Sequence, residues 1–243
     1  MGNKSDPIWV IVPASGVGTR MQGQLPKQYL TLCRKSILEH TLDRLLSFED
    51  INGVILVLRS DDRHWENLDY QSQKPLIIAT GGDERQDSVY SGLLKLLELE
   101  TGDPLVMIHD AVRPLVLHRD LERLIKVGKN NPAGAILGAP VSDTLKRQNE
   151  NENIVETVAR KGLWRAFTPQ LFRAKLLFQA FKHVRENNLQ ITDDAAAIEA
   201  LGMRPGLVDS SAQNIKITHP HDLELATQIL LRQQAQSDLK TKF

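Results

Sequence analysis

Short apolar runs alternate with amphipathic segments over most of this chain. Five runs have the length and the β-branched content of buried strands: residues 8–12, 53–58, 75–79, 105–108 and 133–137. Apolar residues at helical spacing predict helices between these runs. One helix is opened by a capping-box pattern at Ser36 and Glu39, and another begins at Asp87 or Ser88. Strands that are apolar throughout and separated by helices predict a mostly parallel sheet covered on both faces.

The pattern changes from Val141 to Val158. Two short alternating segments flank a polar tip at residues 148–153, which predicts a protruding β-hairpin rather than another strand–helix unit. An isolated two-stranded hairpin is only marginally stable in water. This arm is therefore expected to find support, most simply from a second copy of the chain. The alternative is an unsupported surface hairpin.

The rest of the chain returns to helical spacing. Helices are expected over residues 173–184 and over 193–201, the latter with Thr192 as its N-cap. The sequence contains no visible internal repeat, linker or second domain. We therefore expect a single Rossmann-like α/β domain over residues 1–243, with the arm at about residues 141–160.

Composition narrows the classes of partner. The 243 residues carry 30 Lys and Arg against 30 Asp and Glu, so the chain has no electrostatic footprint for nucleic acid. Cys33 is the only cysteine, which excludes an internal disulfide and a cysteine-based zinc site and suits a reducing compartment. No apolar run approaches the roughly 20 residues of a membrane span. We expect a cytoplasmic protein with neither nucleic-acid nor membrane partners.

The loop after the first strand carries the first candidate chemistry. Pro13 cannot continue the hydrogen-bond ladder, and Gly16 and Gly18 let the backbone approach a ligand closely. Arg20 and Lys27 follow. Bare backbone N–H groups beside two cations suit phosphates. The loop is neither a P-loop nor a complete dinucleotide fingerprint, and it is similar to the nucleotidyltransferase signature; the alternative is an ordinary turn after an edge strand.

Two further loops follow predicted strands. Gly81 and Gly82 allow close approach to a flat base, and Ser88 adds a hydroxyl; the alternative is a tight turn with a helix cap. Asp110 ends the fourth strand, where it can ligate Mg²⁺ or hold a ribose hydroxyl, or else pair structurally with Arg113. Ligands of parallel sheets bind outside the carboxyl ends of the strands, so these loops are expected to share one cleft.

A third group of polar residues lies on and after the predicted arm. Thr144 is on its first limb, Arg160 lies just past its second limb, and Thr168 and Lys216 come later. Two hydroxyls and two cations suit the phosphate of a polyol phosphate. Residues of these types are also common on an ordinary solvated surface, and the residues alone do not decide between these interpretations.

Taken together, the motifs run in one order from Val12 to Thr218. They read P-A-S-G-V-G-T-R-M, L-P-K-Q-Y, I-L-E-H, G-G-D-E-R-Q-D-S-V, H-D-A-V-R-P, A-P-V-S-D-T-L-K, G-L-W-R-A-F-T-P-Q, T-D-D-A and N-I-K-I-T. This combination resembles the 2-C-methyl-D-erythritol 4-phosphate cytidylyltransferases of the non-mevalonate isoprenoid pathway. The resemblance implies CTP and methylerythritol phosphate as substrates, Mg²⁺ as cofactor, a CDP-alditol and pyrophosphate as products, and a homodimer in which the arm completes the neighbour's active site.

The resemblance also implies roles for individual residues. Arg20 and Lys27 would stabilise the transition state at the α-phosphorus. The cytidine would be held by Ala14, Ser15, Gly16, Gly82, Asp83 and Ser88. Asp110 and Ala111 would meet the ribose and the metal. The substrate phosphate would be positioned by Thr144, Arg160, Thr168 and Lys216, of which Arg160 and Lys216 count with Arg20 and Lys27 as catalytic.

Departures from the family pattern and rival functions are few. Ser15 stands where the family often has Ala, and Ala159 stands where Asp is frequent; neither change removes a cation. The rivals are a cytidylyltransferase for another polyol phosphate such as ribitol 5-phosphate, a nucleotidyltransferase for another base, and an inactive nucleotide-binding protein. The presence of Arg20, Lys27 and Lys216 argues against the inactive rival.

The expected reaction needs no strong general base. A phosphate monoester is already an anionic nucleophile, so positioning and charge neutralisation suffice for catalysis.

Overall fold

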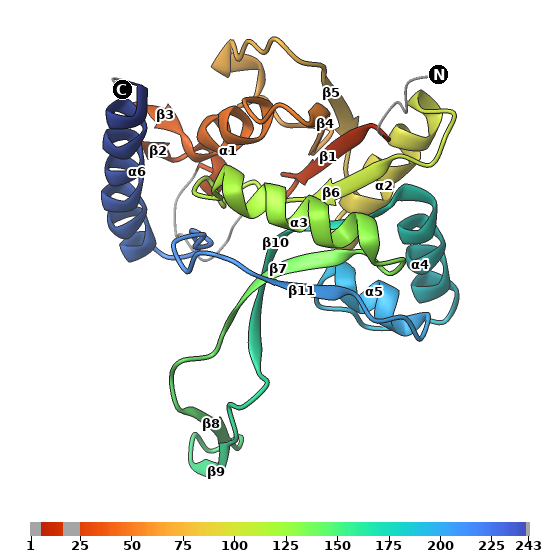
Figure 1. Cartoon of the computed structure of the whole chain (residues 1–243), viewed down its shortest axis with the longest axis vertical. Coiled ribbons are helices and arrows are strands. Elements are labelled where there is room, and N and C mark those ends of the chain that lie inside the picture. Colours follow the sequence, from red (N-terminus) through yellow and green to blue (C-terminus); the bar gives the residue numbers. More distant parts are fainter. Residues whose placement is uncertain (1–5, 17–24, 242–243) are drawn as a thin grey trace.

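One mixed sheet organises the protein. The computed structural model describes residues 6–16 and 25–241, and within them seven strands form this sheet in the order β11-β7-β10-β6-β1-β4-β5 (Figure 1). The strands are β1 Ile8–Pro13, β4 Ile51–Leu58, β5 Leu76–Thr80, β6 Leu105–Ile108, β7 Ala135–Pro140, β10 Trp164–Arg173 and β11 Gly206–Asp209. Every neighbouring pair is parallel except those of β10, which runs antiparallel to β6 and β7. The predicted mostly parallel sheet is confirmed.

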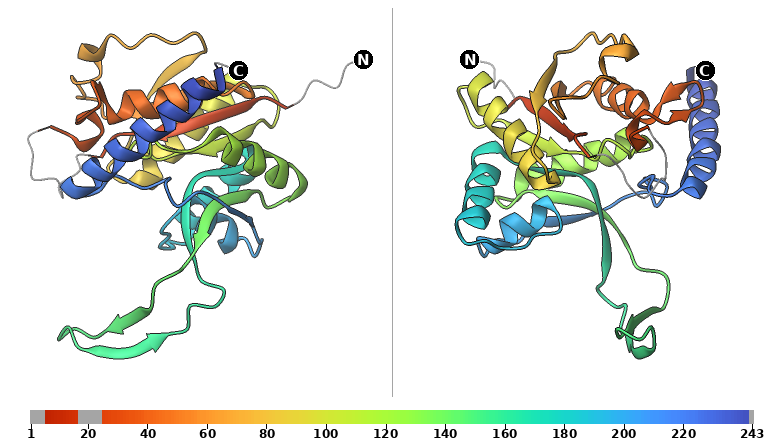
Figure 2. Two further views of the ribbon diagram at one scale, coloured as in Figure 1. Left: turned by 60° about the vertical axis from the view of Figure 1, so that its left-hand side comes forward. Right: turned by 180° about the vertical axis from the view of Figure 1, so that it is seen from behind.

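Helices cover both faces of the sheet because its central strand is apolar on both sides. Val10 and Val12 of β1 point into one core, and Trp9 and Ile11 point into the other. The first core is closed by α1 and α3, and the second by α2, α4 and α5 (Figure 2). The helices are α1 Ile37–Leu46, α2 Arg85–Leu99, α3 His118–Asn130, α4 Ala174–Glu186, α5 Asp194–Ala200 and α6 Pro220–Thr241.

Helix α6 lies beside a small hairpin at one side of the molecule (Figure 1). The hairpin consists of β2 Thr31–Leu32 and β3 Lys35–Ser36, and it follows the 3-10 turn η2, Lys27–Tyr29. Leu32 of the hairpin and Leu230 of α6 are buried in one small apolar cluster. No helix within the described ranges combines the length and the apolar character that crossing a membrane would require.

Local signals predicted some element boundaries correctly and others wrongly. The Ser36 hydroxyl accepts a hydrogen bond from the backbone N–H of Glu39, and the Ser36 backbone N–H donates to the Glu39 carboxylate, so the capping box is confirmed. Helix α2 begins at Arg85, earlier than predicted. The N-cap of α5 is Asp193 and not Thr192, because the Asp193 carboxylate accepts the backbone N–H of Ala196.

The region after Gly138 departs from the expected loop. Strand β7 continues to Pro140 and leads into the arm, which is formed by β8 Leu145–Gln148 and β9 Ile154–Val158. The arm extends away from the body in every view (Figures 1 and 2). Ile154 and Val155 on it are 67% and 61% exposed, which is unusual for β-branched apolar side chains. The predicted hairpin is confirmed, and the arm carries apolar surface that the single chain leaves uncovered.

Two strands of the seven-stranded sheet were not predicted. Pro169 lies inside β10 and argues against a central strand, but the pairing with β7 shifts register between Ala166 and Gln170, which accommodates the proline. Strand β11 has only four residues, of which Leu207 and Asp209 are exposed. Both strands form because long-range partners are present: β11 pairs with β7, and β10 pairs with β6 and β7.

Candidate active site

The loops that follow β1 and β5 meet at the carboxyl end of the sheet. The Ala14 N–H donates to the carbonyl of Val57 at 2.8 Å, and the Gly81 N–H donates to that of Leu58 at 2.7 Å. The hydroxyls of Ser15 and Ser88, far apart in sequence, lie 2.6 Å from each other. The structure thus brings together the two segments that were predicted to hold the nucleotide.

Glycine is required where these loops touch. A Cβ added to Gly81 would lie 2.6 Å from Ser88 Oγ and 2.9 Å from Ser15 Cβ, and one added to Gly82 would lie 2.5 Å from Asp87 Cβ. Ser88 is completely buried, and its hydroxyl also lies 3.2 Å from the carbonyl of Glu84. The bond to Ser88 gives Ser15, the departure from the common Ala, a structural partner.

The turn that carries Lys27 is tied to the same loop. The buried Gln28 amide donates to the carbonyls of Ala14 at 2.8 Å and Gly16 at 3.3 Å. The Tyr29 hydroxyl donates to the carboxylate of Asp62 at 2.7 Å, beyond the end of β4. Lys27 is therefore held beside the Ala14–Gly16 backbone. Arg20, the other predicted loop cation, lies outside the described residues.

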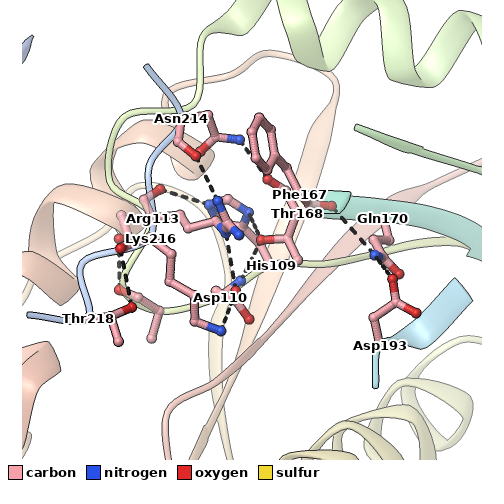
Figure 3. A network of polar contacts seen from close by, with 12 residues as sticks. His109, Asp110, Arg113, Phe167, Thr168, Gln170, Asp193, Asn214, Lys216 and Thr218 are labelled. Carbon is pink, nitrogen blue, oxygen red and sulfur yellow. Dashed lines mark hydrogen bonds and ion pairs between the residues drawn. The ribbon is translucent and has the colours of Figure 1, made fainter. Parts of the chain in front are cut away.

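Asp110, in the loop that follows β6, is the centre of a cluster of charges (Figure 3). Its Oδ2 lies 3.0 Å from Lys216 Nζ and 3.2 Å from Arg113 Nε, and its Oδ1 lies 3.2 Å from Arg85 Nε. Burial alone would raise the pKa of the Asp110 carboxyl, but the charges of Arg85, Lys216 and Arg113 outweigh it and hold this pKa far below its usual range. The structural pairing with Arg113 is therefore present, and Lys216 reaches the same carboxylate.

Arg85 links this carboxylate to a second one. Its guanidinium binds both oxygens of the buried Asp194, at 3.0 and 2.8 Å, while its Nε reaches Asp110. Burial raises the pKa of Asp194, and the charge of Arg85 opposes that rise. The neighbouring Asp193 accepts from the Gln170 amide at 2.9 Å. No role was predicted from the sequence for Arg85, Asp194, Asp193 or Gln170, although they stand in the quoted motifs G-G-D-E-R-Q-D-S-V, T-D-D-A and G-L-W-R-A-F-T-P-Q.

Thr168 also reaches the Asp110 cluster, through its hydroxyl (Figure 3). Thr168 Oγ1 accepts the backbone N–H of Asp110 at 3.0 Å and lies 3.1 Å from His109 Nδ1. The Asn214 amide donates to the Thr168 carbonyl at 2.8 Å, and Arg113 donates to the Asn214 carbonyl at 2.7 Å. The segments around Thr168 and Lys216, predicted to share a substrate, therefore converge on Asp110.

Comparison with known proteins identifies the family. The profile of the family described as "IspD: 2-C-methyl-D-erythritol 4-phosphate cytidylyltransferase" matches residues 8–232. The chain belongs to this family. The 2-C-methyl-D-erythritol 4-phosphate cytidylyltransferase of Hahella chejuensis is 45% identical over 231 residues, 95% of each chain.

Solved structures agree with this assignment. A crystal structure of a 4-diphosphocytidyl-2C-methyl-D-erythritol synthase matches with a TM-score of 0.81 at 34% identity, covering 93% of this chain and 100% of that one. The Francisella tularensis 2-C-methyl-D-erythritol 4-phosphate cytidylyltransferase matches with a TM-score of 0.79 at 33% identity, covering 92% of this chain and 99% of that one. The predicted resemblance is confirmed, and the protein is a cytidylyltransferase.

Two predicted substrate residues of this cytidylyltransferase lie on the arm, apart from the Asp110 cluster. Thr144 is exposed on the first limb. The Arg160 guanidinium donates to the carbonyl of Ser142 on the opposite limb. Among the residues described for a single chain, no hydrogen bond or ion pair joins either of them to the Asp110 cluster. Their predicted contact with substrate therefore stays a prediction.

The geometry also bears on the expected Mg²⁺ site. Both Asp110 oxygens already face cationic nitrogens within 3.2 Å, so this carboxylate does not fit a directly bound metal ion unless a cation moves away. In the part of the chain that the structure describes, no group of three or more His, Cys, Asp or Glu side chains is arranged to hold a metal. Asp110 as a metal ligand stays a prediction.

His109 predicts a pH dependence of stability. Burial lowers the pKa of His109 from 6.5 to about 4. The unfolded chain therefore binds more protons than the folded one between these two values, so stability is expected to fall as the pH drops through this window. The loss is on the order of 3 kcal/mol in the free energy of unfolding.

Urea unfolding of the wild type and of His109→Gln between about pH 4.5 and about pH 7 measures this contribution. Groups common to both proteins cancel in the difference, so the variant should show the shallower pH dependence. Equal pH dependence in the two proteins would contradict the assignment.

Proposed function

We infer that this protein transfers the cytidylyl group of CTP to 2-C-methyl-D-erythritol 4-phosphate, forming 4-diphosphocytidyl-2-C-methyl-D-erythritol and pyrophosphate. The observation that carries this proposal is the family match over residues 8–232, in a chain whose glycine loops and Asp110 cluster occupy one end of the sheet. That end is where ligands of parallel sheets bind. The family match also weighs against the inactive and other-base rivals.

The charges near Asp110 favour an anionic substrate. Three cations, Arg85, Arg113 and Lys216, face two carboxylates, Asp110 and Asp194, which leaves a net charge of +1 (three minus two). The Lys216 side chain is 40% exposed while Asp110 is nearly buried, so the ammonium is the part of this pair that a phosphate can reach. Asp110 would hold Lys216 in place, and Lys216 would bind the substrate phosphate.

The reaction needs orientation and charge neutralisation more than proton transfer. An oxygen of the substrate phosphate attacks the α-phosphorus of CTP in line as pyrophosphate leaves. That oxygen is anionic near neutral pH, so no general base is required. Lys27, held beside the Ala14–Gly16 backbone by Gln28, and Arg20 would neutralise charge on the triphosphate. The Ala14–Gly16, Gly82–Asp83 and Ser88 segments would hold the cytidine, with Asp110 and Ala111 toward the ribose.

The arm is proposed to act in a homodimer. The exposed Ile154 and Val155 would be covered by a second chain, and a twofold arrangement would place each arm against the partner. Arg160 and Thr144 would then reach the substrate phosphate in the neighbouring cleft, where a guanidinium can bind two oxygens. This arrangement would account for the distance of both residues from the cluster of their own chain.

Mg²⁺ remains a proposed requirement, with the triphosphate of CTP as its main source of ligands, since magnesium commonly binds through substrate phosphates. When bound, it would offset charge on the phosphates.

A cytoplasmic location also stays a proposal. It is supported by the single cysteine, Cys33, because a chain without a possible internal disulfide suits a reducing compartment.

Pyrophosphate release with different nucleotides and acceptors tests the proposed reaction. CTP should be preferred over UTP, because UTP carries an acceptor at position 4 in place of the donor of cytosine. An unsatisfied buried group costs about 1–3 kcal/mol, or roughly ten- to a hundredfold in kcat/KM. Methylerythritol phosphate should likewise be preferred over ribitol 5-phosphate. Equal kcat/KM for CTP and UTP would point to another nucleotidyltransferase, and preference for ribitol 5-phosphate would point to the other polyol.

A further inference from the structure

His109 is a buried ring that joins two parts of the active site. It lies directly after β6 and before Asp110, and it is 0% exposed. Its Nε2 lies 3.0 Å from the carbonyl oxygen of Arg113, and its Nδ1 lies 3.1 Å from Thr168 Oγ1 (Figure 3). Both partners belong to segments that contact Asp110 or Lys216, yet neither the family motif nor the mechanism above gives this ring a function.

The chemistry of these partners determines where the protons lie. A carbonyl oxygen only accepts, so the contact with Arg113 requires a proton on Nε2 of His109. In a neutral imidazole Nδ1 is then an acceptor, and the Thr168 hydroxyl must donate to it. Thr168 Oγ1 keeps its lone pairs, one of which accepts the backbone N–H of Asp110 at 3.0 Å.

The chain of hydrogen bonds therefore has one direction. It runs from the Asp110 N–H to Thr168 Oγ1, from the Thr168 O–H to His109 Nδ1, and from the His109 Nε2–H to the Arg113 carbonyl. With the proton on Nδ1 instead, the Nε2 lone pair would face the carbonyl lone pairs of Arg113. The two ends of the chain thus select one tautomer of the ring and one orientation of the hydroxyl.

We propose that His109 is a positioning residue of the cytidylyl transfer: its Nδ1 accepts a hydrogen bond from the Thr168 hydroxyl, which orients that oxygen to accept the Asp110 N–H and thereby holds the Asp110 backbone where its carboxylate engages Lys216. This inference rests on the proposed function. It also changes the expected role of Thr168. A hydroxyl whose only proton is committed to His109 does not donate to a phosphate oxygen; it can accept from a hydroxyl of the polyol.

Nitrogen-15 NMR of the histidine side chains tests the tautomer directly and without any turnover. His109 should show a protonated Nε2 and an unprotonated Nδ1 in the wild-type protein. Thr168→Val, which removes the donor to Nδ1, should shift the Nδ1 resonance. A proton on Nδ1 in the wild type would overturn the proposal, whether or not the protein uses CTP.

Kinetics of a double-mutant cycle test whether His109 acts through Thr168. His109→Leu and Thr168→Val should each lower kcat by roughly ten- to a hundredfold, the scale of a small misplacement in an active site. The double variant should lose about as much as either single variant, because both remove one pathway. His109→Asn, which keeps an acceptor near the Nδ1 position, and Thr168→Ser, which keeps the hydroxyl, should recover most of the lost kcat.

A control at a half-buried histidine separates positioning from the loss of any contact between a histidine and a backbone carbonyl. His118 on α3 is also a histidine whose Nε2 contacts a backbone carbonyl, that of Arg44 at 2.9 Å. His118→Leu should change the midpoint of unfolding and leave kcat unchanged. Multiplicative kcat losses in the folded double variant, or no recovery in His109→Asn and Thr168→Ser, would reject the proposal. If His109→Leu does not fold, the His109→Asn and Thr168 variants together with the NMR result decide it. Failure of wild-type turnover with CTP and methylerythritol phosphate would instead reject the proposed function.

Discussion

A Lys27→Ala enzyme is expected to turn over on the order of a hundredfold more slowly than the wild type, the scale of losing one preorganised charge-stabilising donor. Gln28 holds the Lys27 turn against the carbonyls of Ala14 and Gly16, in the loop that is proposed to bind the nucleotide. Its charge counts most when negative charge develops on the leaving pyrophosphate. The loss should therefore appear in kcat more than in the KM for the polyol phosphate.

The measurement is steady-state pyrophosphate release, with Lys35→Ala as the matched control. Lys35 lies on β3 close to Lys27 in sequence, and its ammonium pairs with Asp43 on α1 at 2.5 Å. Removing that half-exposed pair should change stability by at most about 1 kcal/mol and leave kcat unchanged. The Lys27→Ala protein should still unfold cooperatively, so that its kcat is measured on folded enzyme. A folded Lys27→Ala protein with near-normal kcat would refute the assignment of this lysine.

Mixing two inactive variants is expected to restore activity if the arm works in the neighbouring subunit. Arg160→Ala alone should weaken binding of the polyol phosphate while CTP still binds, because a guanidinium that binds two phosphate oxygens is lost. In a mixed dimer of Lys27→Ala and Arg160→Ala chains, one cleft carries both defects and the other carries neither. With full subunit exchange in an equal mixture, about a quarter of wild-type activity should appear.

The opposite arrangement predicts a different result. If Arg160 serves the cleft of its own chain, each cleft of the mixed dimer keeps one defect and mixing restores nothing. Subunit exchange must be verified separately, for example with two affinity tags. Arg147→Ala provides a matched arm control, since Arg147 is an exposed arginine on β8 that pairs with Glu156 on β9 at 2.6 Å. Mixtures of Lys27→Ala with Arg147→Ala should be active from the Arg147→Ala chains alone, without any requirement for exchange.

The structure refines the chemistry expected of Asp110. The carboxylate that suggested a metal ligand is surrounded by Arg85, Arg113 and Lys216, and its pKa is held far below the usual range because these three charges outweigh the effect of burial. It therefore acts in this arrangement as an anchor for cations. Lys216 is the most exposed of the three and is the one proposed to face substrate.

Local patterns in the sequence predicted much of the fold. Apolar runs identified five of the seven strands described in the sheet. Four of them, β1, β4, β6 and β7, lie inside the sheet and must be apolar because both faces are covered, whereas β5 is a partly exposed edge strand. The Ser36–Glu39 capping box and the hairpin arm followed from signals that span only a few residues. Strand β10 was missed because Pro169 disfavours a strand locally, and its register shift next to β7 is visible only in three dimensions. Asp193, and not Thr192, caps α5, a choice between adjacent residues that spacing alone does not make.

The sequence by itself determined which chemical groups are present: the glycine loops, the loop cations and the order of motifs that marks a cytidylyltransferase. Only the tertiary structure decided which groups meet. Arg85 joins Asp110 and Asp194, and Lys216 reaches Asp110, across separations that no local periodicity records. The physical reason is that a buried charge must be compensated by whichever opposite charge the folded chain brings within a few ångströms. That choice depends on how the strands and helices pack against one another, and a list of residues does not contain it.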